Sequence, residues 1–162
     1  MKNNKLKEIK GYAIAIIIPL IIGGISAFIT RDAMDKFQEL NQPFLSPPSW
    51  VFPVVWTILY ILMGIASYLI YKNKNVFYYK ERENSLILYA VQLVFNFIWS
   101  ILFFNMKVFT FAFVWLLVLW VLILLLIINA KKVNKVASYL LIPYLLWVTF
   151  AGYLNLMISI LN

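Results

Sequence analysis

The side chains best suited to chemistry in this sequence are uncharged amides set into long apolar stretches. Gln92, Asn96 and Ser100 recur every four residues, so in a helix they lie on one face. An unpaired amide in lipid costs several kcal/mol, so this face must meet other protein, water or a ligand. Hydrogen bonding between helices and contact with a bound molecule fit the pattern equally well.

Aromatic rings recur at the same spacing in two other stretches. One face of the first carries Trp56, Tyr60 and Gly64. One face of the second carries a set of four residues, namely Pro143, Trp147, Ala151 and Asn155. Flat rings with a few directional amides, including those of Trp99 and Asn96, are typical of a site for a large, flat, mostly apolar molecule. Packing of the same rings in a protein core is the alternative.

Several kinds of chemistry are excluded by the residue types. The chain has no histidine and no cysteine, which removes the commonest metal and haem ligands, the commonest general base and every thiol nucleophile. No Asp, Glu, Lys or Arg falls within the apolar stretches, which argues against proton pumps, voltage sensors and most ion-coupled transporters. We therefore expect a binding site without a metal or resident cofactor.

The composition identifies the environment of the chain. Apolar residues make up 64% of the 162 residues and charged residues only 12%, which is typical of a membrane protein. The net charge of +8 comes from lysines beside apolar stretches, so membrane lipid is a better partner for them than nucleic acid.

Five apolar stretches are long enough to cross a bilayer. About 20 residues of helix span the roughly 30 Å of hydrocarbon. We therefore predict an all-α integral membrane protein, with residues 1–162 forming one domain that is a single bundle of five transmembrane helices. The predicted spans are residues 11–30, 53–71, 85–104, 109–130 and 136–161.

The first predicted span carries a patch of small residues. Gly23, Gly24, Ser26 and Ala27 would let another helix, or a flat ligand, approach the backbone closely. Close packing of a helix is the more common use of such a patch.

The stretch between the first two spans is rich in proline and predicts a lid-like loop. Pro47 and Pro48 oppose regular helix, whereas Pro53 suits the first turn of a helix, so we expect the second helix to begin near Pro53. Trp50 fits an interfacial aromatic belt. We assign Pro47, Pro48, Trp50 and Pro53 to the lid and its hinge.

The part of this connection nearest the first span predicts a further short element. Met34, Phe37 and Leu40 lie three residues apart, as expected for an amphipathic helix at the membrane surface.

The distribution of positive charge predicts the orientation. With five spans, eleven of the fourteen Lys and Arg residues fall on the side of the N-terminus. The positive-inside rule therefore places the N-terminus in the cytoplasm and the C-terminus outside, with the lid-like loop on the outer face.

Three blocks of sequence resemble a known family. They are residues 46–60 (SPPSWVFPVVWTILY), residues 96–104 (NFIWSILFF), and residues 143–155 (PYLLWVTFAGYLN). Their order and spacing are similar to those of the tryptophan-rich sensory protein (TspO) and mitochondrial translocator protein family, once called peripheral benzodiazepine receptors. The chain resembles a bacterial member, which implies a location in the bacterial plasma membrane.

The resemblance implies a function and a set of site residues. Members of the family are membrane receptors or sensors that bind porphyrins and other tetrapyrroles in a pocket inside the bundle, covered by the first loop. Carried over, the ligand-binding residues are Trp56, Tyr60, Asn96, Trp99, Trp147, Ala151 and Leu154. Two alternatives stay open, namely light-dependent oxidation of the bound porphyrin, with Trp56 or Trp147 supplying electrons, and transport of tetrapyrroles or lipids.

Two features of the family are incomplete here. The sterol-recognition pattern of mitochondrial members needs a tyrosine and a basic residue after Leu154-Asn155, where this chain has Leu156 and no later Lys or Arg. Some bacterial relatives form homodimers through small residues of the third helix. Here that span offers only Ala90 and Ser100, so the sequence gives limited support for a homodimer.

Overall fold

The computed structural model describes residues 2–37 and 39–162 and confirms a bundle of five membrane-spanning helices. All five helices are long and apolar enough to cross a membrane, and the described residues contain no β-strand. The 3-10 turn η1 (Val76–Tyr78) precedes α3, and the π-helical turn η2 (Ile101–Asn105) extends it. The helices are α1 (Lys2–Phe37), α2 (Val51–Tyr71), α3 (Tyr79–Ser100), α4 (Phe109–Val133) and α5 (Lys135–Leu161).

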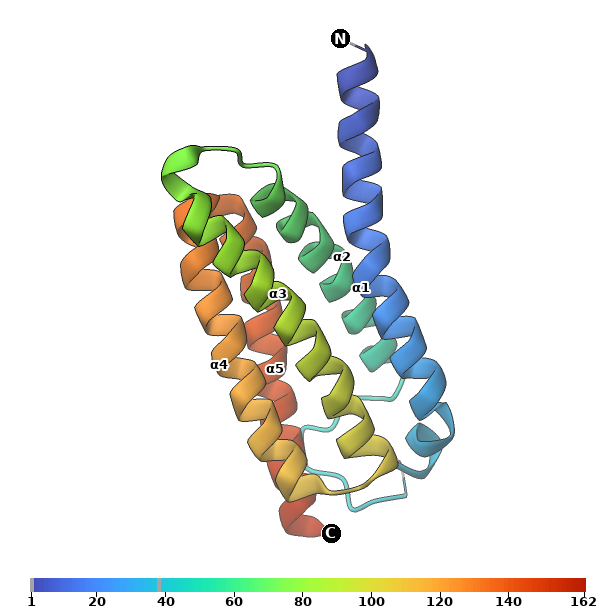
Figure 1. Ribbon diagram of the computed structural model, residues 1–162. Helices are drawn as coiled ribbons and strands as arrows, with labels where there is room; N and C mark the ends of the chain where they lie inside the picture. Colours follow the sequence, from blue (N-terminus) through green and yellow to red (C-terminus); the bar gives the residue numbers. More distant parts are fainter. Residues whose placement is uncertain (1, 38) are drawn as a thin grey trace.

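The five helices pack unequally, as Figure 1 shows. Helix α4 lies along α5 and α3, while α1 lies mainly along α2, and α2 also packs on α5. One face of α4 is buried, including Leu116, Leu119 and Ile123, whereas Val114 and Leu117 on its other face are exposed. The exposed face is apolar, as expected for a helix that faces lipid.

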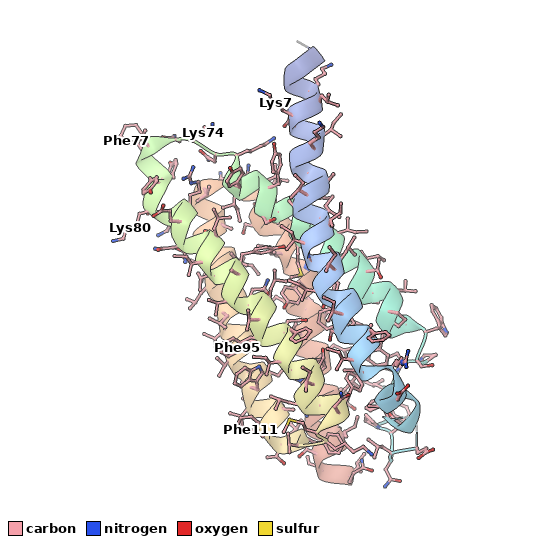
Figure 2. All side chains as sticks on the ribbon, turned by 45° about the vertical axis from the view of Figure 1, so that its right-hand side comes forward. Lys7, Lys74, Phe77, Lys80, Phe95 and Phe111 are labelled. Carbon is pink, nitrogen blue, oxygen red and sulfur yellow. The ribbon has the colours of Figure 1, made fainter. Side chains whose placement is uncertain are left out.

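The two ends of the bundle differ in charge and in the chain termini that they carry. Helix α1 projects beyond the other helices at its N-terminal end, and the C-terminus lies at the opposite end (Figure 1). Figure 2 shows Lys7, Lys74 and Lys80 together at the N-terminal end, with Phe77 pointing away from the bundle. The basic segments therefore lie at one end of the molecule. Which side of the membrane this end occupies stays a prediction.

The expected separate amphipathic helix is wrong. Helix α1 continues without a break to Phe37, because no glycine or proline interrupts residues 25–37. The Phe37 ring packs inward, with its centroid 5.6 Å from that of Phe103 and 5.5 Å from that of Phe104. Phe37 therefore anchors the end of α1 to the bundle. The side chain of Met34 lies outside the described part.

Helix α2 begins at Val51, two residues before the predicted start. Pro53 lies in its first turn, where a backbone N–H has no partner within the helix and its absence costs nothing. The Pro53 carbonyl accepts a hydrogen bond from the Thr57 hydroxyl at 2.7 Å.

Residues 39–50, which connect α1 to α2, are hydrogen-bonded to the end of α1 and to the C-terminal residue. Gln42 Nε2 donates to the Phe37 carbonyl at the end of α1 (2.6 Å), and the Ser46 hydroxyl donates to Gln42 Oε1 (2.8 Å). The backbone N–H of Asn41 donates to Asn162 Oδ1 (3.0 Å), and the Asn162 amide donates back to the Asn41 carbonyl (3.3 Å). The connection is thereby held against the C-terminus of the chain.

Candidate ligand-binding cavity

A cavity of about 430 Å³ lies at the C-terminal end of the bundle, between α1, α2, α3 with η2, and α5. Its volume falls in the usual range for small-molecule sites, roughly 300–1,000 Å³. The residues that line it are Gly23, Ser26, Ala27, Thr30, Arg31, Ser49, Trp50, Phe52, Pro53, Trp56, Tyr60, Trp99, Ser100, Phe104, Trp147 and Ala151.

Aromatic rings from three helices form most of the wall. Trp56 stacks on Tyr60 one turn further along α2, with centroids 5.5 Å apart and planes at 29°. From α5, Trp147 meets Phe52 edge to face at 6.1 Å. From α3, Trp99 stacks on Phe103 at 5.3 Å, which fixes the indole that borders the cavity. Each of these three indoles is thus held in place by contact with another ring before any ligand binds.

Helix α1 supplies the small-residue wall. Gly23, Ser26, Ala27 and Thr30 line the cavity, at a spacing that puts them on one helical face. A Cβ atom at Gly23 would overlap the ring of Tyr60, so the glycine lets the Tyr60 ring lie against the α1 backbone. The Thr30 hydroxyl is satisfied by the Ser26 carbonyl at 2.9 Å and does not need a ligand.

Asn96 lies behind the cavity wall and does not line it. The Tyr60 hydroxyl donates to Asn96 Oδ1 at 3.0 Å, and Asn96 Nδ2 donates to the Tyr144 hydroxyl at 3.1 Å. The Tyr144 hydroxyl in turn donates to Gln92 Oε1 at 2.7 Å. Asn96 is only 1% exposed, so its amide joins α2, α3 and α5 through a buried network.

Asn155 and Leu154, two further residues of α5 singled out from the sequence, also face the packed core. Asn155 accepts a hydrogen bond from Trp99 Nε1 at 3.1 Å and donates to the Phe109 carbonyl at 2.8 Å, so its amide joins α5 to α3 and α4. Leu154 is 4% exposed and does not line the cavity, whereas Ala151 does. Pro143 is exposed and also lies away from the cavity.

The mouth of the cavity lies beside the connection between α1 and α2. Trp50 is 65% exposed and lines the cavity, so it has a place in the site, and its position in an interfacial belt stays a prediction. Pro47 and Pro48 line a second cavity of about 390 Å³, which borders the first at Phe52 and Phe104. Of the four residues predicted to form the lid and its hinge, Trp50 and Pro53 thus line the candidate site, and Pro47 and Pro48 lie next to it.

One polar atom at the site has no hydrogen-bond partner among the described residues. Trp147 Nε1 is buried and unpaired, while the rest of the indole borders the cavity. A buried donor without a partner is costly, so an acceptor that reached this nitrogen would stabilise the site.

Sequence reasoning missed several lining residues. Phe52 and Phe104 belong to motif blocks but were not singled out, and Arg31 was counted only for the orientation of the chain. Thr30 could have been found from its spacing with Gly23 and Ser26 on one face of α1. No pattern within one helix indicates that Arg31 lies at the mouth, because that depends on how α1 meets α2.

Comparison with known proteins identifies the family. The model of the TspO/MBR family matches residues 15–161. The chain is 39% identical to the tryptophan-rich protein TspO of Chlorobaculum tepidum, over 96% of this chain and 98% of that protein. It is 35% identical to the tryptophan-rich sensory protein of Cereibacter sphaeroides, over 74% and 72%, and 36% identical to the translocator protein of Bos taurus, over 86% and 82%. The chain therefore belongs to the TspO/MBR family of integral membrane proteins.

Proposed function

We propose that this protein is a membrane receptor that binds porphyrins or related tetrapyrroles in the cavity between α1, α2, α3 and α5. The observation that carries the proposal is the wall itself, in which the indoles of Trp50, Trp56, Trp99 and Trp147 surround one open space. Aromatic faces gain most from a flat, polarisable partner that can stack on them.

The remaining wall suits the same class of ligand. Gly23, Ala27 and Ala151 add little bulk, so a flat molecule can approach the backbones of α1 and α5. The mouth is open at Trp50, so a tetrapyrrole wider than the cavity can project from it. We further propose that the connection of residues 39–50 acts as a lid, because Trp50 borders the mouth and Pro47 and Pro48 border the adjoining cavity.

Titration of the purified protein with protoporphyrin IX in the dark tests this function. The shift of the porphyrin absorption band reports binding and does not depend on the number of tryptophans. Trp147→Phe and Trp56→Phe should each weaken binding by about two- to tenfold, because each removes part of a stacking surface that is typically worth about 0.5–1.5 kcal/mol.

Trp115→Phe is the matched control. Trp115 stacks on Phe95 at 4.4 Å and donates to the Phe95 carbonyl at 2.9 Å, and it does not line the cavity. Its replacement should leave the affinity unchanged. If all three variants bind protoporphyrin IX as the parent does, the porphyrin does not occupy this cavity and the proposal fails.

A second function, light-dependent oxidation of bound porphyrin, is favoured by one observation. Trp56 stacks on Tyr60, and Tyr60 donates to Asn96, so an easily oxidised pair borders the cavity. Illumination of the complex in air should then give a new absorbing product, and Trp56→Phe should slow its formation after correction for occupancy. Bleaching at the same rate in detergent alone would exclude the reaction.

A further inference from the structure

Among the described residues that line the cavity, one carries a charge at neutral pH. That side chain is Arg31, which follows the buried residue Thr30 at the mouth of the cavity. An arginine beside an aromatic cavity is not needed for binding an uncharged ring. Its place at the mouth favours a ligand that carries a negative charge at one edge.

Two described residues, Phe28 and Asp32, hold the guanidinium of Arg31 in place. The guanidinium carbon lies 4.7 Å from the centroid of the Phe28 ring, so one face rests on that ring. Nε donates to Asp32 Oδ1 at 3.2 Å. The described residues accept no hydrogen bond from either terminal nitrogen, and these two nitrogens form the planar fork that matches a carboxylate.

We propose that the cavity selects ligands that carry a carboxylate, and that Arg31 binds this group at the mouth while the ring system lies among the tryptophans. The inference rests on the proposed function and names the class of ligand more narrowly. It also sets the orientation of the ligand, with the acid outward and the apolar ring inward.

The position of Arg31 fits the cost of burying charge. A carboxylate inside the hydrocarbon region would lose its hydration, whereas the side chain of Arg31 is 63% exposed and offers a partner where water still reaches. The inner wall at Tyr60 and Trp99 carries no charge, so it accepts only the apolar part. The cavity is therefore charged at its mouth and uncharged at its inner wall, which suits an amphipathic acid.

Asp32 competes with such a ligand. Its carboxylate already occupies Arg31 Nε and offsets part of the positive charge. Because the side chain of Asp32 is 88% exposed and does not line the cavity, replacing it should not disturb the fold. Asp32→Asn should therefore bind a carboxylate ligand more tightly than the parent does.

A matched pair of ligands tests the inference. Protoporphyrin IX and its dimethyl ester share one ring system and differ only in the two carboxylates. In an uncharged detergent at low salt, the parent should bind the diacid about tenfold more tightly than the ester, as expected for a charge-assisted hydrogen-bonded pair near water. Arg31→Gln should remove this preference, Arg31→Lys should keep part of it, and Asp32→Asn should increase it.

The controls separate the role of Arg31 from general effects of charge. Lys107→Gln removes one positive charge in the α3–α4 connection at the same end of the bundle without touching the cavity, and it should leave the preference unchanged. Added salt should weaken binding of the diacid by the parent and should have little effect on the ester. Anionic phospholipid added to the detergent should not displace the diacid; displacement that depends on Arg31 would show that a lipid phosphate occupies the site and would overturn the inference.

The outcomes also distinguish this inference from the proposed function. If the parent binds both ligands equally, or if the preference survives Arg31→Gln, the inference is wrong and tetrapyrrole binding still stands. If the parent binds neither ligand, the proposed function fails and this inference fails with it. Loss of both ligands in Arg31→Gln alone would show that Arg31 supports the fold of the cavity and does not select for an acid.

Discussion

Replacing Tyr60 with phenylalanine separates two roles of the cavity wall. The ring of Tyr60 faces the cavity, and its hydroxyl stabilises the bundle through Asn96. The substitution removes one hydroxyl and keeps the ring, so the stacking on Trp56 at 5.5 Å is retained. The hydroxyl donates to Asn96 Oδ1 at 3.0 Å, and the described residues offer that oxygen no other donor. Tyr60 is 7% exposed and Asn96 1% exposed, so water cannot readily replace the lost donor.

The expected loss of stability is modest. Hydrogen bonds between membrane helices contribute about 0.6 kcal/mol on average and up to about 1.7 kcal/mol. Leaving a buried acceptor unpaired costs about 1–3 kcal/mol. Asn96 Nδ2 keeps its bond to Tyr144 at 3.1 Å, so only one end of the network is lost. We therefore expect the free energy of unfolding of Tyr60→Phe to fall by about 1–2 kcal/mol.

Reversible unfolding in mixed micelles with increasing denaturing detergent measures this change. Tyr153→Phe is the control, because no described residue forms a hydrogen bond with the Tyr153 hydroxyl and the phenylalanine ring can still stack on Phe150. The affinity for protoporphyrin IX should change less than about threefold, since the ring that faces the cavity is unchanged. A tenfold loss of affinity without loss of stability would refute the reasoning, because Tyr60 would then act on the ligand and not on Asn96.

Three further substitutions test how the bundle is held together. Gly64→Ala should lower the free energy of unfolding by about 1–3 kcal/mol, because the new Cβ would lie 2.5 Å from the Ile16 Cα atom and force α1 away from α2, whereas Gly24→Ala, with no atom within 4 Å, should be tolerated. Lys72→Met should lower stability by at most about 1 kcal/mol at pH 8. The hydrogen bonds to Glu8 and then Tyr12 raise the pKa of Lys72 above 10.5, so this difference should be present below pH 10.5 and disappear at higher pH as the parent loses the proton. Asn41→Ala removes the hydrogen bond that the Asn41 side-chain amide donates to the Leu161 carbonyl, at 3.3 Å, and should speed hydrogen exchange in residues 39–50.

Each of these expectations has an outcome that contradicts it. Equal stability of the two glycine variants would show that α1 and α2 do not pack as closely as the structure places them. A difference for Lys72→Met that persists at pH 12 would show that the lost contribution is packing and not the ion pair with Glu8. Unchanged exchange in Asn41→Ala would show that the hydrogen bond from the Asn41 side chain to Leu161 does not help to hold the connection.

The helices could be predicted well because their signals are local. A run of about 20 apolar residues without a charge crosses the membrane as a helix wherever it sits in the bundle. The prediction failed at the end of the first span, where the spacing of Phe37 and Leu40 indicated a new surface helix. The contact that keeps this segment in α1 is the packing of Phe37 on Phe103 and Phe104, which lie more than sixty residues later in the chain.

The candidate site could be predicted only in part. Spacing along one helix correctly indicates that Trp56 and Tyr60 share a face of α2, and that Trp147 and Ala151 share a face of α5. It does not indicate how deep each side chain lies. Asn96 has the spacing expected of a ligand contact, and the structure instead places Tyr60 between its amide and the cavity.

The sequence by itself determined the class of the protein, because the length and apolarity of the spans, the absence of histidine and cysteine, and the three motif blocks are properties of single segments. Only the tertiary structure decided which of these residues meet. It brings Arg31 and Trp50 to the same mouth and turns Asn155 toward Trp99. The physical reason is that one helix specifies which side chains share a face, whereas the cavity is made where faces of four helices converge, and that convergence depends on packing between segments far apart in the chain.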